Sequence, residues 1–414
     1  MWPKIWKLLP HYDCGFCTNP SCRTFARRVL IRLQPPTECE FLLKENLEKI
    51  TSLLNETKED VKKTTFSEEI EGEAEFVKIE PCAEYGRVTL EAQLPKPRGS
   101  PFEDLYDMID LGFLLEGATF LKDIRSSLSL GYALAQYGDS KVHIFKTGKI
   151  VMRRIENQEI AMQLFRNLSK ILWGAVICKC GNSGLDCVAG GCFHCHDEVC
   201  PFLAWGLENK KSYLTKPGYS LISKADKSGF KDLFFEVKNR LNEIVKNFET
   251  ALKTIEKEGE EKGKNIMIKT GVKESFREKL RSLFNSLRDV GCQLLIETKE
   301  DIGGIIGLIL VGTAQNLKRA NEGLLALENE VNIDLLKSSS MLFLEGYKVF
   351  ETGDKTKASN LETQYENFFN DWKIDYATKK KDENLNGKNL ANLLKIAING
   401  IFTSKMITRI LPAG

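Results

Sequence analysis

Three cysteines near the start of the chain, Cys14, Cys17 and Cys22, form a C-x2-C-x4-C run, and Cys39 follows within the length of one short helix. Four thiolates at this spacing can surround an iron–sulfur cube or a tetrahedral zinc ion. Such a site holds its ligand-bearing segments close to one another, because all of them bind the same metal or cluster. The cysteines therefore constrain the fold of the first 45 residues and predict a module that binds a metal or a cluster.

A helix is expected directly after the cysteine run, with Phe25, Val29 and Leu33 on its apolar face. Ser21 or Thr18 can cap it, and the Pro35-Pro36 pair ends it. The helix also carries four arginines: Arg23, Arg27, Arg28 and Arg32. These arginines either offset the negative charge of a thiolate-bound cluster or form an ordinary solvated face.

Residues 8–42 resemble a known module, the four-cysteine [4Fe-4S] domain of the large subunit of the corrinoid iron–sulfur protein (acetyl-CoA decarbonylase/synthase type). They are also similar to the matching module of some membrane-associated electron-transfer subunits. The positions that carry the resemblance are Leu8, Leu9, Pro10, Cys14, Gly15, Cys17, Cys22, Phe25, Ala26 and Cys39. The resemblance implies a [4Fe-4S] cluster on the four cysteines and an anaerobic setting. No succession of βα units that would hold a corrinoid follows, so methyl transfer is not implied.

A second cysteine-rich segment contains six cysteines: Cys178, Cys180, Cys187, Cys192, Cys195 and Cys200. The last three repeat the C-x2-C-x4-C spacing of the first run. A second [4Fe-4S] cluster would take these three and one of the earlier cysteines. The middle of the segment also matches a plant-type [2Fe-2S] spacing, with a further distant cysteine. A structural zinc ion, with His194 or His196 as a ligand, is the third alternative.

The remaining composition excludes some classes of protein. The chain has 414 residues and 12 cysteines, and its formal net charge of +2 gives no general attraction to nucleic acid. No signal peptide is visible, and the longest apolar run, Ile302–Thr313, is too short to span a bilayer. We therefore expect a cytoplasmic protein whose cysteines are reduced, without a membrane span.

The region between the two cysteine segments predicts a small antiparallel sheet with helices on one face. Alternating residues indicate strands at 76–79 and 87–92, and a hairpin of Lys141–Phe145 with Lys149–Arg153. Residues 102–129 are expected to form one or two helices, and Glu159–Leu172 another.

The second half of the chain is helical in pattern. Amphipathic helices are predicted at 230–255, 276–287, 317–350 and 390–411, which indicates a helical bundle. The fold class is therefore α+β. The expected units are a four-cysteine module (1–45), a helix with an acidic linker (46–75), an α+β domain (76–175), the second cysteine segment (176–206) and a helical domain (207–414).

Several isolated features favour structural roles. His143 lies in an alternating strand, and Cys82 and Cys292 are expected to be buried core residues. Every histidine precedes residue 197, so the bundle has no Glu-x-x-His pair for a di-iron site. The glycines of residues 303–307 lack the Lys-Ser/Thr of a phosphate loop. No nucleophile–base combination is visible.

These observations lead to one main hypothesis and two alternatives. The main hypothesis is an iron–sulfur protein of anaerobic metabolism that passes single electrons to or from a protein partner. The first alternative is an assembly or interaction factor with structural zinc or Fe-S sites and a partner-binding bundle. The second is a redox enzyme with a substrate pocket between the sheet and the bundle.

Overall fold

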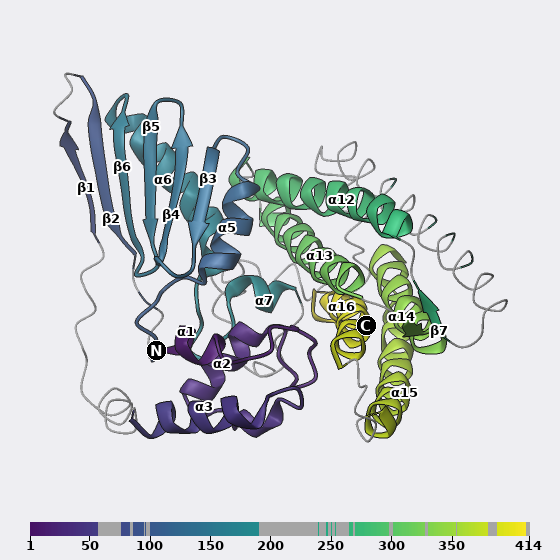
Figure 1. The fold of residues 1–414 in the computed structure, drawn as a ribbon. Coiled ribbons are helices and arrows are strands. Elements are labelled where there is room, and N and C mark those ends of the chain that lie inside the picture. Colours follow the sequence, from purple (N-terminus) through teal and green to yellow (C-terminus); the bar gives the residue numbers. More distant parts are fainter. Residues whose placement is uncertain are drawn as a thin grey trace.

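The structure is a computed structural model of the chain. It describes residues 1–56, 76–82, 86–94, 96, 100–189, 265–267, 270–297, 301–327, 330–352, 354–379 and 387–410, with single positions at 239, 246, 250 and 253. Three parts are distinct in Figure 1: an N-terminal module, a sheet with its covering helices, and a set of long helices. This arrangement confirms the predicted α+β class.

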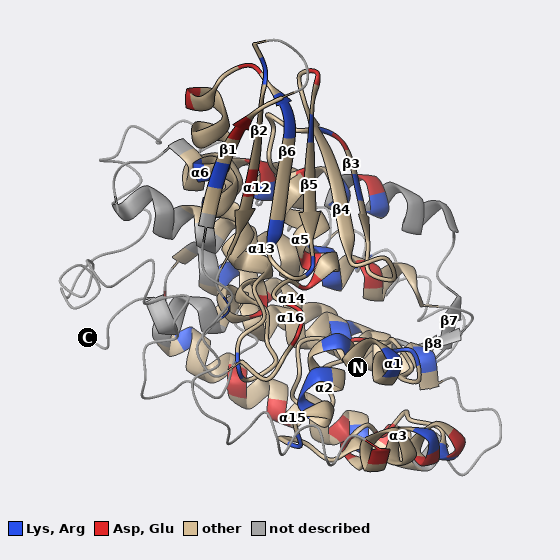
Figure 2. Ribbon diagram, turned by 90° about the vertical axis from the view of Figure 1, so that its left-hand side faces the viewer, with Lys and Arg blue, Asp and Glu red and all other residues tan. Residues whose placement is uncertain are grey.

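The N-terminal module consists of short helices around a small core of its own. The helices are α1 (Trp2–Trp6), α2 (Cys22–Leu30) and α3 (Lys44–Glu56), with a 3-10 turn at Pro36–Glu38. Its core contains Trp2, Ile5, Phe25, Val29, Ile50 and Leu54. Both basic and acidic residues occur along α3, which leaves that helix without a single dominant charge (Figure 2).

The sheet has six strands, and every neighbouring pair is antiparallel. The strands are β1 (Phe76–Pro81), β2 (Val88–Gln93), β3 (Lys122–Ser127), β4 (Tyr132–Tyr137), β5 (Ser140–Phe145) and β6 (Lys149–Ile155), in the order β1-β2-β6-β5-β4-β3. The predicted hairpin is confirmed, because Lys141 pairs with Arg153 and Ile144 with Ile150 across its turn. The predicted strands at 76–79 and 87–92 are confirmed as β1 and β2.

The prediction for residues 102–129 is wrong in its second half. Helix α5 (Met108–Glu116) ends at Gly117, and β3 then begins at Lys122. The following strand β4 was not predicted. Strand β3 is a sheet edge, and all six of its residues are exposed or half-buried. An edge strand of this kind lacks the apolar alternation by which a strand is recognised, since charged residues there prevent edge-to-edge pairing.

Helices α5 and α6 (Gln158–Leu172) cover one face of the sheet. A 3-10 turn (Trp173–Ala175) and the short helix α7 (Gly184–Val188) then lead the chain back toward the N-terminal module. Asn157 and Ser183 cap α6 and α7 through their side-chain oxygens. This return places the start of the second cysteine segment beside the first cysteine module.

The bundle contains α12 (Thr270–Glu297), α13 (Asp301–Leu325), α14 (Ile333–Thr352), α15 (Lys355–Lys379) and α16 (Gly387–Ile410), with a strand pair β7 (Asn265–Met267) and β8 (Glu330–Asn332). The helices predicted at 276–287 and 390–411 are confirmed as parts of α12 and α16. The helical segment predicted at 317–350 is divided between α13 and α14, with β8 between them, and most of the helix predicted at 230–255 lies outside the described residues. The bundle and the sheet layer share one apolar core. Within the described residues, no helix combines the length and the apolarity that crossing a bilayer requires.

The glycine-rich start of α13 has a packing role. A Cβ atom on Gly307 would lie 2.7 Å from the carbonyl oxygen of Gly291 on α12, and a Cβ on Gly291 would lie 2.8 Å from the carbonyl of Gly307. Distances this short do not occur between real Cβ and backbone atoms. The two helices therefore approach so closely that only glycine fits at both positions.

We predict that Gly307→Ala lowers the free energy of unfolding by about 1–3 kcal/mol, the usual cost of overpacking. Chemical denaturation of the variant and the wild type measures the difference. Ser282→Ala on the exposed side of α12 is the control, because it raises helix propensity without a close neighbour. A Gly307→Ala variant as stable as this control would contradict the close contact.

Candidate cluster-binding site

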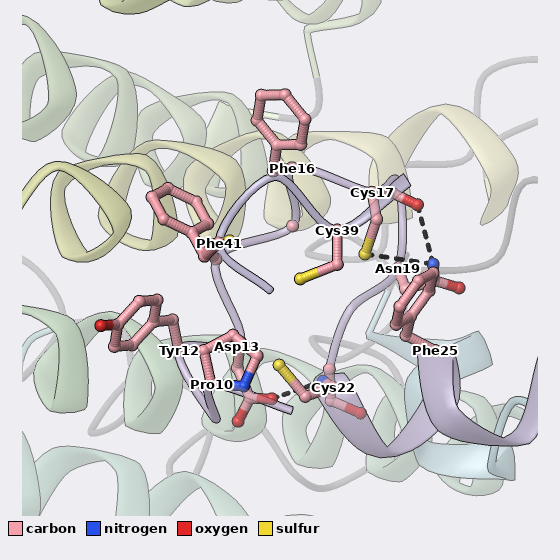
Figure 3. A pocket seen from close by; sticks show the side chains of 13 residues that line it. Pro10, Tyr12, Asp13, Phe16, Cys17, Asn19, Cys22, Phe25, Cys39 and Phe41 are labelled. Atoms are coloured by element: carbon pink, nitrogen blue, oxygen red, sulfur yellow. Dashed lines mark hydrogen bonds between the residues drawn. The ribbon is translucent and has the colours of Figure 1, made fainter. Parts of the chain in front are cut away.

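The four cysteines of the N-terminal module line a single cavity. Cys14 and Cys17 lie in the loop after α1, Cys22 is the first residue of α2, and Cys39 follows the 3-10 turn. The cavity has an empty volume of about 330 Å³, which includes the solvent at its mouth. Figure 3 shows the sulfur atoms of Cys17, Cys22 and Cys39 directed into this common space. The structure thus brings together residues that are up to 25 positions apart (39 − 14) in the sequence.

The loop reaches this geometry through a tight bend. Gly15 has a φ of +74°, and its carbonyl accepts a hydrogen bond from the Thr18 N–H at 2.9 Å. A Cβ at Gly15 would also collide with Ile398 of α16. Asp13 closes the loop by accepting the backbone N–H of Cys22, and Ser21 caps α2. The predicted cap at Ser21 is confirmed.

Aromatic side chains form the apolar walls of the cavity. Phe16 and Phe41 line it and pack against Trp372 of α15, with ring centroids 5.6 and 6.0 Å apart. Trp372 in turn stacks between Phe369 and Tyr376 on the same helix, at interplanar angles of 16° and 6°. This row of rings closes the side of the cavity that faces the bundle.

The cysteines differ in their exposure to solvent. Cys14 and Cys22 are buried, with 8% of each residue exposed, whereas Cys17 and Cys39 are half-buried. A cluster in this cavity would therefore be covered on the side of Cys14 and Cys22 and would lie nearer the surface at Cys17 and Cys39.

Burial raises the pKa of all four thiols, with neighbouring acidic and thiol groups adding to the effect at Cys14, Cys22 and Cys39. The pKa of Cys39 rises to about 12. Buried thiolates need a nearby positive charge, and iron bound to sulfur supplies it. The donor set of four soft sulfur ligands around one cavity fits an iron–sulfur cluster, and its binding would release the thiol protons.

The arginines of α2 are buried, so the expectation of a solvated helix face is wrong for three of them. Arg27 and Arg28 have no exposed surface, and Arg23 is 6% exposed. Only Arg32 remains exposed, and its guanidinium donates to the carbonyl of Leu54. Long-range partners that local sequence does not reveal account for the burial.

Three aspartates from elsewhere in the chain pair with Arg23 and Arg27. Arg23 donates to Asp107 at 2.8 Å and to Asp110 at 2.9 Å, and Arg27 donates to Asp107 at 2.7 Å. Asp186 on α7 accepts from Thr24 at 2.8 Å and also from Arg319 on α13. We call these residues, Arg23, Thr24, Arg27, Asp107, Asp110, Asp186 and Arg319, the buried ion network. The network connects α2 to α5, α7 and α13.

The acidic members of the network differ in their pKa. Burial raises the pKa of Asp110 to about 6, and the charge of Asp107 adds to this effect despite the opposing charge of Arg23. At Asp107 burial also acts to raise the pKa, but Arg23 and Arg27 outweigh it and hold the pKa below its ordinary range. Asp107 is thus the ionised centre of the network.

The second cysteine segment is described only in its first part. Cys178 and Cys187 are buried, and Cys180 is half-buried. The backbone carbonyls of Cys180 and Gly181 accept hydrogen bonds from Arg28 and Arg27. The segment therefore begins in direct contact with the helix that carries Cys22.

Further residues of the predicted second site, Cys192, Cys195 and Cys200 with His194 and His196, lie outside the described residues. Among the described residues, no three His, Cys, Asp or Glu side chains converge closely enough to hold a single metal ion. A metal or cluster at residues 178–200 stays a prediction.

His143, Cys82 and Cys292 were each predicted to have a structural role. His143 accepts or donates a hydrogen bond with the Tyr132 hydroxyl at 2.6 Å through Nδ1. Cys292 is fully buried as predicted, but Cys82 is only half-buried, so its prediction as a core residue is wrong. Cys82 lies at the end of an edge strand, where fewer neighbours cover a side chain.

Comparison with protein families finds a match in the N-terminal module. A family model described as "Putative Fe-S cluster" matches residues 9–41, which include all four cysteines of the cavity. Residues 9–41 form an iron–sulfur module. The narrower likeness to the corrinoid iron–sulfur protein is not confirmed by this match. Neither the comparison with curated proteins nor the comparison with solved structures gives a match.

We predict that Asp107→Asn lowers the free energy of unfolding by about 3–5 kcal/mol at pH 7, because it leaves Arg23 and Arg27 buried without their anion. Asparagine keeps the Oδ1 acceptor that caps α5, but it replaces Oδ2, the acceptor for Arg23 and Arg27, with an NH2 donor. Denaturation curves measure the difference. The folded-state pKa of Asp107 is depressed, so its contribution is complete above the ordinary carboxyl pKa of about 4 and shrinks as pH falls below it.

The matched control is Glu116→Gln, which removes the acidic partner of Arg288 at a carboxylate that is 59% exposed. An exposed partner of this kind contributes at most about 1 kcal/mol. Equal stability losses for the two variants at pH 7 would show that the buried ion network does not hold α2 in place.

Proposed function

We propose that the chain binds one [4Fe-4S] cluster through Cys14, Cys17, Cys22 and Cys39 and exchanges single electrons with a protein partner in anaerobic metabolism. The observation that carries the proposal is the single cavity that all four cysteines line, within the segment matched by the iron–sulfur family. When bound, such a cluster accepts and releases one electron at a time.

The shape of the cavity supports a cluster over zinc. In a tetrahedral zinc site each sulfur lies about 2.3 Å from the ion, so the four sulfurs nearly touch. Among the described residues no three His, Cys, Asp or Glu side chains are placed to hold one metal ion, and the four cysteines instead line a common cavity with aromatic walls. A cube fits such an arrangement because each thiolate binds a different iron atom.

The position of the cavity supports electron exchange. Cys17 and Cys39 are half-buried, so a partner that docks at this edge would come near the cluster. The opposite side is covered by Cys14, Cys22 and the aromatic row of α15. Acid–base chemistry on a substrate has less support, because the carboxylate in the lining, Asp13, already accepts the Cys22 N–H.

A structural cluster is the second candidate, and the buried ion network favours it. The helix that carries Cys22 is joined to three other parts of the chain by buried charges. A cluster at its N-terminus would stabilise this junction whether or not it is reduced. Under this alternative the protein is an assembly or interaction factor.

Residues 178–200 are proposed to hold a second [4Fe-4S] cluster or zinc, on the basis of their six cysteines. Anaerobic purification followed by quantification of iron, sulfide and zinc tests both sites. Electron paramagnetic resonance of the reduced protein then tests the function. A signal at an ordinary ferredoxin-like potential supports electron transfer, and a cluster reducible only at extreme potentials favours the structural role. Zinc without sulfide at both sites would exclude the proposal.

We predict that the double variant Cys14→Ala, Cys17→Ala loses about half of the iron if two equal clusters are present, and nearly all of it if the second site holds zinc. Cys14 and Cys17 are both proposed ligands of the first cluster, so the electron paramagnetic resonance signal of that cluster disappears in either case. Cys82→Ser, which changes a half-buried cysteine outside both segments, should retain the wild-type iron. Unchanged iron and signal in the double variant would remove Cys14 and Cys17 from the ligand set.

A further inference from the structure

Asn19 places a hydrogen-bond donor against one of the cluster ligands. Its Nδ2 lies 3.3 Å from the Cys17 Sγ and 2.7 Å from the Cys17 carbonyl oxygen (Figure 3). The same nitrogen donates to Oε1 of Gln34 at 2.7 Å. Asn19 is 1% exposed, so water does not compete for these contacts.

The direction of the Asn19 amide is determined by its neighbours. Arg28 donates from Nη1 to the Asn19 Oδ1 at 2.7 Å, and a guanidinium can only donate. At the other end Gln34 donates from Nε2 to the Glu38 carboxylate at 3.0 Å, and a carboxylate can only accept. The chain Arg28–Asn19–Gln34–Glu38 therefore has one polarity, in which the amide nitrogen of Asn19 is the donor. Its two N–H groups are shared among the Cys17 carbonyl, Gln34 Oε1 and the more distant Cys17 sulfur.

Arg28 differs from the other buried arginines in its partners. Besides Asn19 it donates to the Cys180 carbonyl at 3.1 Å and to the Asn182 Oδ1 at 3.2 Å, all of which are neutral. No carboxylate in the described part of the chain lies within ion-pair distance of Arg28. A fully buried cation with neutral partners is costly unless an anion lies close. A cube held by four thiolates is such an anion, and Asn19 lies between Arg28 and its ligand Cys17.

We propose that Asn19 and Arg28 are positioning residues that set the redox potential of the cluster. The inference rests on the proposed function, because it requires a reducible cluster on Cys17. Reduction adds negative charge to the cluster and its sulfurs. An N–H donor at Sγ and a buried guanidinium behind it both stabilise that charge, so both raise the potential.

The test is a redox titration of the full chain, followed by electron paramagnetic resonance. Asn19→Leu keeps the number and branching of the side-chain heavy atoms but removes the donor to Cys17 and the acceptor of Arg28. It should lower the equilibrium constant for reduction about tenfold, which is a shift of about 59 mV to more negative potential for a one-electron couple. Arg28→Gln removes both the positive charge and the planar guanidinium that orients Asn19. The potential should therefore shift in the negative direction by at least as much. Arg28→Lys restores the charge without the planar guanidinium and should recover only part of the shift.

Arg32→Gln is the matched control, since it removes a positive charge from the residues just after α2 without a contact to Asn19. The equilibrium constant for reduction of the cluster should change by less than twofold in this variant. Equal shifts for Arg28→Gln and Arg32→Gln would overturn the positioning role, and so would an unchanged potential in Asn19→Leu with full iron and sulfide.

A variant that removes a more distant contact keeps the proposal testable if Arg28→Gln does not fold. Asn182→Ala removes one acceptor of Arg28 and should shift the potential in the same direction by a smaller amount. No shift in Asn182→Ala together with none in Asn19→Leu contradicts the proposal. Failure of the proposed function is distinguishable, because the wild-type protein would then contain no reducible cluster at all.

Discussion

The ion pairs between Arg23, Arg27 and Asp107 hold the N-terminal module against the rest of the molecule. All three side chains are almost completely buried, and the contacts span about eighty residues of sequence. Charges are removed from water here at a cost of several kcal/mol each, which only close and complete pairing offsets. The orientation of α2, and with it the position of Cys22, depends on this pairing.

The location of the cluster cavity follows from that constraint. Because α2 is fixed between the sheet layer, α7 and α13, the loop that carries Cys14 and Cys17 packs against α16 and α15. The aromatic row on α15 closes one wall, and the turn at Cys39 leaves the opposite edge nearer to solvent. A cofactor in this cavity would be shielded on one side and approachable on the other, which is the arrangement that electron exchange with a partner requires.

The two cysteine segments are linked by the same helix. Arg27 and Arg28 donate to the backbone carbonyls of Gly181 and Cys180, at the beginning of the second segment. Arg28 also reaches Asn19 beside Cys17. The helix therefore connects the environment of the first set of cysteines to the chain that leads into the second, through hydrogen bonds rather than through a shared ligand.

The sequence by itself determined the features that depend on neighbouring residues. Cysteine spacing identified the four residues of the cavity, and alternation identified the hairpin of β5 and β6. The sequence also narrowed the cap of α2 to Ser21 or Thr18, of which the structure has Ser21. Tertiary structure alone decided the rest. Strand β3 is polar because it is an edge, and the arginines of α2 are buried because aspartates distant in the sequence meet them. Local patterns record what a residue prefers, whereas the burial of a charge depends on a partner that folding brings from elsewhere in the chain.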